Sequence, residues 1–386
     1  MDRRQFVAGA FAMSGTACVT PGSNSPMSLL SSRTEQLRTS GRVNFSRDGL
    51  DLSPSEHTEL LAKLCADGGI AADNYSRGGV VAQLEDAFAK ALGKECAVFL
   101  PTGTLANHLA LRRLTSVHGR KRVAVQAESH VFRDSGDCAQ ELSGVHLLPL
   151  AAGQTTFTAE ALRNEIERTA AGRVRTEIGA VSVESAVRRL HNRRFDADEL
   201  KRVIAVAREH DIALHLDGAR LFIESVFSGV GVRELAQPFD TVYVSLYKAF
   251  HSGSGAVLAG PANLLEGLYH ERRMFGGGMP QVWPYAAIAL SFLEGTQARL
   301  QAANQKADAL FELLAKRHDV AIERFADGSN VVMWRVGKAR AERIAKHAMQ
   351  HGVTLPRPTA DGTLALKINE SLNRAETEKI LAALTP

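Results

Sequence analysis

The stretch Ile212-Ala-Leu-His-Leu216-Asp217-Gly218-Ala219-Arg220 is an apolar run that stops at a carboxylate, a glycine and a guanidinium. Its length and composition predict a buried β-strand over residues 212–216. The turn that follows would place Asp217 and Arg220 at the carboxyl end of this strand, where open α/β sheets bind their ligands. Taken by itself, the stretch is more typical of an Asp-Gly turn that ends a strand, with Arg220 in solvent.

On both sides of this stretch, short apolar runs alternate with longer amphipathic segments. This alternation is typical of an α/β domain with a largely parallel sheet. The run Asp196–Glu199 predicts the acidic first turn of a helix that ends near His210, because carboxylates cap and stabilise helix N-termini. We predict one large sheet of seven strands, at residues 96–100, 122–126, 145–150, 178–183, 212–216, 241–245 and 256–259.

The pattern changes near Gln297, where a long amphipathic helix begins and continues through Leu314. Strand-like and helical segments then follow at residues 331–335, from 339, 364–368 and from 375. This arrangement predicts a smaller α+β domain at the C-terminus. We therefore divide the chain into a signal and linker (1–33), a large domain (41–296) and a small domain (297–386).

The composition excludes several classes of protein. With 386 residues, of which 45% are hydrophobic and 23% charged, the chain can bury a core in about two domains and is neither disordered nor a coiled coil. The net charge of +4 comes from basic residues spread along the chain, so we expect no nucleic-acid partner. We also expect no metal site or disulfide framework, because the four cysteines stand far apart, at positions 18, 65, 96 and 138.

The N-terminus carries Arg3-Arg4, then an apolar run at 7–13 and small residues up to Ala17. This order resembles a twin-arginine export signal. The apolar run is shorter than the roughly 20 residues that cross a membrane, so we expect no membrane anchor in the mature form. An exported, periplasmic protein is the prediction. A cytoplasmic protein with an irregular N-terminus, or lipidation of Cys18, are the alternatives.

A second motif joins the predicted strand 96–100 to a predicted helix through Pro101-Thr102-Gly103-Thr104. A small-residue turn at a helix N-terminus leaves backbone N–H groups unpaired at the positive end of the helix dipole. With threonine hydroxyls beside them, these groups suit a phosphate. A threonine-capped turn without a ligand is the alternative.

A third motif follows the predicted strand 241–245, where Leu246-Tyr247-Lys248 leads into a loop of small residues. The same sheet edge would then carry the Lys248 amine, the Asp217 carboxylate and the phosphate turn. A cofactor that forms a Schiff base needs all three groups: a lysine, an acid for its pyridinium nitrogen and donors for its phosphate. The combination therefore predicts pyridoxal 5'-phosphate (PLP).

Together, the motifs resemble the threonine aldolase and aromatic amino acid β-eliminating lyase family of PLP-dependent enzymes, which has the aspartate aminotransferase fold (fold type I). The resemblance begins near Val43 and continues to the C-terminus. The motifs that carry it are Phe99-Leu-Pro-Thr-Gly-Thr-Leu-Ala-Asn107, Glu128-Ser129-His130, Leu214-His-Leu-Asp-Gly-Ala-Arg-Leu-Phe222, the Lys248 segment and Arg273-Met-Phe-Gly-Gly-Gly-Met279.

The resemblance implies a role for each of these residues. Lys248 holds the cofactor, and Asp217 pairs with its ring nitrogen. The phosphate is bound by Gly103 and Thr104. His130 stacks on the ring. For the reaction, our candidate base is His130 or a water that it orients.

The resemblance also implies that Arg220 lies beside the cofactor and the substrate. It further implies a homodimer or homotetramer in which the loop 276–278 reaches a neighbouring subunit.

The sequence departs from the family pattern around the substrate. The segment Val183-Glu184-Ser185-Ala186-Val187 replaces the usual Glu-Asn-Thr-His-Asn and leads into a basic run at 188–194. The late arginine that binds the substrate carboxylate has Lys367 as its nearest counterpart, and an ammonium cannot reproduce the planar guanidinium. The basic run could bind an acidic substrate group, although a solvated charged face is the more frequent explanation.

The leading hypothesis is a PLP-dependent lyase that cleaves a threonine-like β-hydroxy amino acid to glycine and an aldehyde. One alternative is a lyase that eliminates a β-substituent, since the same cofactor geometry permits it. The other is a PLP-binding protein that has lost catalysis through the changed loop, although Lys248 and Asp217 argue against it.

Overall fold

The computed structural model describes residues 41–316 and 321–386. The predicted export signal, with Arg3, Arg4 and Cys18, lies outside the described residues. Within the described ranges, no helix combines the length and the apolar character that a membrane span requires.

The seven predicted strands form one sheet in the order β2-β8-β7-β6-β5-β3-β4. Only β8 runs antiparallel to its neighbours, and the other pairs are parallel. The predicted mostly parallel α/β fold is therefore confirmed, with each strand end within one residue of its expected place. The strands are β2 (Cys96–Leu100), β3 (Arg122–Gln126), β4 (His146–Leu150), β5 (Ile178–Glu184), β6 (Ala213–Asp217), β7 (Thr241–Ser245) and β8 (Ala256–Gly260).

The register of the central strands determines which side chains share the carboxyl edge. Every residue of β5 and β7 is buried, as expected for strands covered on both faces. Glu184 of β5 pairs with Asp217 of β6, and Asp217 pairs with Tyr243 of β7. The polar ends of three neighbouring strands therefore lie side by side.

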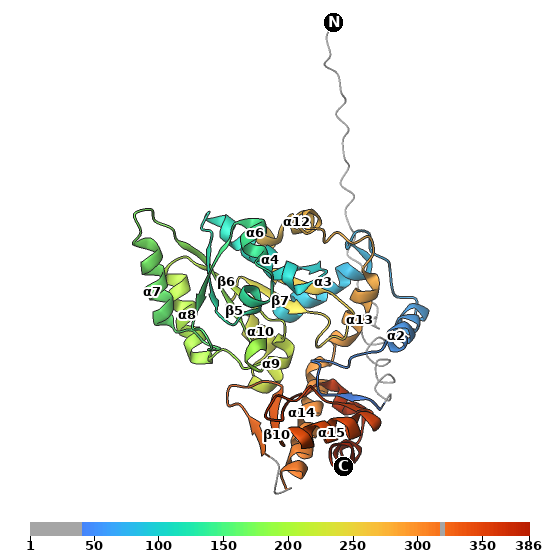
Figure 1. Ribbon diagram of the computed structural model, residues 1–386. Coiled ribbons are helices and arrows are strands. Elements are labelled where there is room, and N and C mark those ends of the chain that lie inside the picture. Colours follow the sequence, from blue (N-terminus) through green and yellow to red (C-terminus); the bar gives the residue numbers. More distant parts are fainter. Residues whose placement is uncertain (1–40, 317–320) are drawn as a thin grey trace.

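Helices cover both faces of this sheet (Figure 1). One face packs against α2 (Pro54–Ala66), α3 (Gly79–Leu92), α7 (Ala159–Ala170), α8 (Ala197–Glu209), α9 (Leu221–Ser228), α10 (Val232–Ala236) and α13 (Trp283–Leu293). The other packs mainly against α4 (Gly103–Val117), α5 (His130–Arg133), α6 (Cys138–Ser143), α11 (Ala262–Leu265) and α12 (Leu268–Met274). The predicted N-cap of α8 is confirmed, since the Asp196 carboxylate accepts the backbone N–H groups of Asp198 and Glu199.

The C-terminal part forms a second, smaller body, drawn in orange and red in Figure 1. Its antiparallel sheet has the order β12-β10-β9, and its core is separate from that of the large sheet. Its elements are α14 (Thr296–Ala315), β9 (Ala321–Arg324), β10 (Val331–Arg335), α15 (Lys338–Gln350), β11 (Val353–Thr354), β12 (Thr363–Lys367), the 3-10 helix η3 (Glu370–Arg374) and α16 (Thr377–Leu384).

The first described residues belong structurally to this small body. Strand β1 (Val43–Asn44) pairs in parallel with β11, and Val43 and Phe45 are buried in the small core. We call residues 43–51 the N-terminal strap. Although the sequence pattern groups the strap with the large domain, it crosses from the small core to the carboxyl edge of the large sheet.

Candidate functional site

A cavity of about 710 Å³ lies at the carboxyl edge of the large sheet, between the two domains and the strap. Among the residues that line it are all seven predicted site residues: Gly103, Thr104, His130, Asp217, Arg220, Lys248 and Lys367. These residues come from five separate segments of the chain. The fold therefore brings the whole predicted constellation into one place.

The turn after β2 forms one wall of the cavity. The Thr102 hydroxyl accepts the backbone N–H of Leu105 and so caps α4, whose first residue is Gly103. A Cβ atom on Gly103 would lie 1.9 Å from Oη of Tyr243, so only glycine fits here. The N–H groups of Gly103 and Thr104 precede those used by this cap and lie at the positive end of a 15-residue helix, where an anion can bind.

Asp217 ends β6 and is buried. Its Oδ2 accepts a hydrogen bond from Nδ2 of Asn107 at 2.6 Å, and its Oδ1 accepts the N–H of Ala219 at 3.2 Å. The Asn107 amide is in turn held by Nε2 of His215 at 2.9 Å. Burial lowers the pKa of His215 to about 4, so this ring is neutral near pH 7 and leaves the Asp217 charge to be balanced from the cavity.

Lys248 follows β7 and is also buried. Its Nζ donates a hydrogen bond to the Tyr247 hydroxyl at 3.0 Å. In the part of the chain that the structure describes, no carboxylate forms an ion pair with this amine. The hydrogen bond to Tyr247 holds the amine at the cavity, where it can act as a nucleophile.

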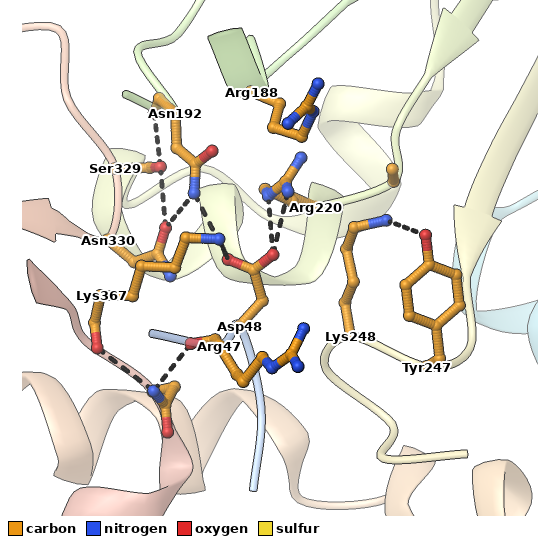
Figure 2. A network of polar contacts seen from close by, with 12 residues as sticks. Arg47, Asp48, Arg188, Asn192, Arg220, Tyr247, Lys248, Ser329, Asn330 and Lys367 are labelled. Atoms are coloured by element: carbon orange, nitrogen blue, oxygen red, sulfur yellow. Dashed lines mark hydrogen bonds and ion pairs between the residues drawn. The ribbon is translucent and has the colours of Figure 1, made fainter. Parts of the chain in front are cut away.

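Asp48 of the strap lies between the two domains (Figure 2). Its Oδ2 accepts hydrogen bonds from Nη2 and Nε of Arg220 at 2.9 and 3.1 Å, and its Oδ1 lies 3.1 Å from Nζ of Lys367. Burial alone would raise the pKa of Asp48, but the charges of Arg220 and Lys367 hold it far below its usual range. Arg220 and Lys367, the two cations predicted to contact substrate, thus already form ion pairs with the Asp48 carboxylate.

The rewritten segment after β5 contributes a further cation. The backbone N–H of Arg188, the first residue of η2 (Arg188–Leu190), donates to Oε1 of Glu184 at 2.9 Å, and its guanidinium donates to Asp134 at 2.5 Å. Burial and the Asp217 charge raise the pKa of Glu184 to about 7, against the hydrogen bonds from the backbone N–H groups of Arg188 and His130. Arg188 thereby faces the cavity beside the sheet edge.

The rest of the basic run does not act as one patch. Arg189 lies 3.3 Å from Asp134, Arg193 forms three hydrogen bonds with Asp327, and Arg194 donates to the carbonyl of Gly328. Of this run, only Arg188 lines the cavity.

His130 begins α5, and its ring lies between Thr104 of the turn after β2 and the carboxylate of Asp134. Its Nε2 lies 3.4 Å from Oγ1 of Thr104, and its Nδ1 lies 3.8 Å from Asp134. Burial alone would raise the pKa of Asp134, but the hydrogen bond and charge of Arg188 lower it. An ionised Asp134 therefore stands beside the ring.

Sequence reasoning missed Asp48, Asn107 and Tyr247 as members of the site. Asp48 has no local pattern that indicates a function, and its partner Arg220 lies 172 residues away. Asn107 ends one of the motifs that carry the resemblance, but the motif does not show its contact with Asp217, which lies 110 residues away. Tyr247 directly precedes the predicted lysine, but the sequence does not show that the two side chains meet. Among the described residues, no three His, Cys, Asp or Glu side chains are close enough to hold a metal ion.

The residues present fit a cofactor that carries an aldehyde, a ring nitrogen and a phosphate. An amine, a buried carboxylate and a helix N-terminus where a Cβ would collide meet at one cavity. Fold and site thus match the fold type I class of enzymes, a class that uses PLP.

Comparison with known proteins gives the family. The family model described as Beta-eliminating lyase matches residues 62–337, and the chain belongs to this family. The predicted family, fold type and lyase class are therefore confirmed.

The chain is 28% identical over 280 residues to low-specificity L-threonine aldolase 1 of Arabidopsis thaliana, covering 71% of this chain and 78% of the relative. A crystal structure assigned to an L-allo-threonine aldolase of Listeria monocytogenes EGD-E is similar at a TM-score of 0.72 and 25% identity, covering 93% and 99% of the two chains. A structure of SPT with PLP has a TM-score of 0.62 at 17% identity, with 89% and 87% covered.

Proposed function

We propose that this protein is a PLP-dependent lyase that cleaves the Cα–Cβ bond of a β-hydroxy amino acid, releasing glycine and an aldehyde. The observation that carries the proposal is the meeting of Lys248, Asp217 and the Gly103 turn in one cavity. The similarity to an L-threonine aldolase supports the choice of substrate class.

Each part of the cofactor has a matching group in the chain. The Lys248 amine would bond to its aldehyde carbon, Asp217 would pair with its ring nitrogen, and the N–H groups at Gly103 and Thr104 would bind its phosphate. When bound, PLP supplies an electron sink for the bond that breaks at Cα. Asp217 would keep the ring nitrogen protonated, and its hydrogen bonds from Asn107 and Ala219 hold the carboxylate in place.

His130 is our candidate base for the β-hydroxyl proton. Its side chain is 28% exposed at the cavity wall, with the ionised Asp134 beside Nδ1. A carboxylate on that side favours a proton on Nδ1 and leaves Nε2 as the acceptor. Proton transfer by a positioned side chain contributes roughly 10²–10⁴-fold to a rate.

The substrate carboxylate would meet the cations of the cavity. Arg220 and Lys367 are the predicted contacts, and both already hold Asp48. Arg188 adds a guanidinium that faces the same space and that is 47% exposed. A carboxylate could therefore bind Arg188 without displacing Asp48.

The test is a product assay with purified protein and PLP, using threonine, phenylserine and a β-substituted amino acid as substrates. We expect glycine and the matching aldehyde from the β-hydroxy substrates, and no product from Lys248→Ala. The control Lys201→Ala changes an exposed helix residue, 76% accessible, and keeps full activity. Pyruvate and ammonia in place of glycine would instead identify a β-eliminating lyase. Bound cofactor without any turnover would identify a binding protein.

We also propose export through the twin-arginine route, on the basis of Arg3-Arg4 and the short apolar run that follows. This route carries folded proteins, so the cofactor could be bound in the cytosol. Fractionation of cells expressing the full chain and an Arg3→Lys, Arg4→Lys variant tests it. We expect the wild-type chain alone in the periplasm.

A homo-oligomer is the remaining proposal. Tyr75, Tyr269 and Met274 are 44%, 46% and 62% exposed, and Met274 lies two residues before the loop 276–278 that the family resemblance places at a subunit contact. Light scattering of the purified protein should give a dimer or tetramer mass. A monomer mass would contradict the proposal.

A further inference from the structure

The side chains of Tyr247 and Lys248 meet, although the two residues are neighbours in the chain. Consecutive side chains of an extended strand point to opposite faces. Strand β7 ends at Ser245, and the backbone bends through residues 246–248. The bend places both side chains on the cavity side, with Nζ of Lys248 at 3.0 Å from the Tyr247 hydroxyl and 4.3 Å from the ring centre.

The direction of this hydrogen bond is informative. An ammonium or amine group donates and the phenol oxygen accepts, so Tyr247 is positioned to receive a proton from Lys248. Within the described ranges, no other side chain forms a hydrogen bond with this amine. The Tyr247 side chain is itself accessible, with 49% of the residue exposed.

We infer that Tyr247 is a catalytic residue that exchanges a proton with Lys248, and this inference rests on the proposed function. Lys248 must be a neutral amine each time that it bonds to the cofactor's aldehyde carbon. In the step that we assign to Tyr247, an N–H bond of the Lys248 ammonium breaks and an O–H bond forms on the Tyr247 phenolate. The products are a neutral amine and a neutral phenol, and the reverse transfer restores the starting charges.

The charges around the pair favour this exchange. Burial alone would raise the pKa of Tyr247, but the charge and hydrogen bond of Lys248, with the charge of Arg220, lower it below its usual value of 10. Tyr243 also lines the cavity and interacts electrostatically with Tyr247, and burial raises the pKa of Tyr243 well above 10, so it stays neutral.

Two further charges act on Lys248 from the other side. Asp48 and Lys367, of the strap and the small domain, both interact with its amine electrostatically and with each other directly. The negative charge of Asp48 and the positive charge of Lys367 act on Lys248 in opposite directions. Ionisation of Tyr247 therefore changes the net charge around the Lys248 amine.

The test compares Tyr247→Phe with the wild-type holoenzyme. The substitution removes one oxygen atom and keeps the ring, and Lys201→Ala, on an exposed side chain of α8, is the control. The first readout is the pH titration of the visible cofactor band without substrate. An anionic partner within about 4–6 Å shifts a pKa by about one to three units, so we expect the midpoint to fall by that amount in Tyr247→Phe and to stay fixed in Lys201→Ala.

The second readout is the pH dependence of kcat. We expect the wild-type kcat to rise with pH as Tyr247 ionises. In Tyr247→Phe this rise should be absent, and kcat should be about 10²-fold lower than in wild type. A loss of kcat with an unmoved band titration would indicate a structural role and overturn the inference. A wild-type protein without a cofactor band would overturn the proposed function and this inference with it, whereas a band that titrates identically in wild type and Tyr247→Phe overturns this inference alone.

Discussion

Asp48 and Arg220 form a buried ion pair in which both Nε and Nη2 of the guanidinium donate to one carboxylate oxygen, at 3.1 and 2.9 Å. Arg220 follows the end of β6 in the large domain, whereas Asp48 belongs to the strap that packs into the small domain. Lys367 of β12 completes the arrangement at 3.1 Å. Asp48 therefore contacts a cation of each domain, so the position of these cations at the cavity depends on how the two domains are packed.

Replacing Asp48 by Asn should destabilise the protein. Removing one partner of a buried ion pair costs about 3–5 kcal/mol, because the other charge stays buried without compensation. Since the charges of Arg220 and Lys367 lower the pKa of Asp48, its stabilisation is present at pH values above 3.8 and declines as the pH falls below that value. Urea denaturation at pH 7 and at pH 3 measures the effect. The difference from wild type should shrink at the lower pH, and equal stabilities at pH 7 would contradict the account. Asp86→Asn, on an exposed residue, is the control.

Glu184 gives the opposite pH dependence. Its pKa is raised to about 7 by burial and by Asp217, so the folded state favours the protonated acid. The resulting stabilisation is complete below pH 4.5 and is lost as the pH rises through about 7. Glu184→Gln cannot ionise, so its stability relative to wild type should increase between pH 5 and pH 8 in denaturation experiments. The exposed Glu312→Gln should show no such trend. A constant difference across this range would show that Glu184 is ionised throughout.

Gly103→Ala should weaken cofactor binding. The new Cβ would lie 1.9 Å from Oη and 2.3 Å from Cζ of the buried Tyr243, so the turn or the ring must move. Overpacking of this kind typically costs about 1–3 kcal/mol, which corresponds to roughly 5- to 150-fold in affinity if the strain falls on the bound state. Spectroscopic titration with PLP measures it. Gly69→Ala is the control, because its Cβ meets no atom within 4 Å. Unchanged affinity would mean that the turn does not contact the cofactor.

Asn107→Ala tests the support of the carboxylate. The variant removes the amide that donates to Asp217 at 2.6 Å and that accepts from His215. A hydrogen bond to a charged group contributes about 1.5–3 kcal/mol, so we expect a decrease of roughly 10- to 150-fold in kcat/KM. The product assay with threonine measures it, and unchanged kinetics would remove Asn107 from the site.

The strands and the lysine motif could be predicted from sequence for a physical reason. Strands buried on both faces require continuous apolar runs, and the residue that follows each run in a parallel sheet must lie at the carboxyl edge. Asp217 and Lys248 were therefore located by local patterns alone. The predicted strand 241–245 has the same ends as β7 in the structure.

Asp48 could not be found in the same way. It lies in the irregular part of the strap, and its partners Arg220 and Lys367 are 172 and 319 residues further along the chain. Nothing local in the sequence indicates that the strap leaves the small core to reach this cavity. The role of Lys367 as a substrate contact stays a prediction, with the added finding that Asp48 already holds its ammonium.

The measurement that tests the central claim most directly is borohydride reduction of the protein with PLP, followed by peptide mass spectrometry. The account predicts loss of the visible band and a pyridoxyl group on the peptide that contains Lys248. A pyridoxyl group on other lysines only, or no modification at all, would contradict it.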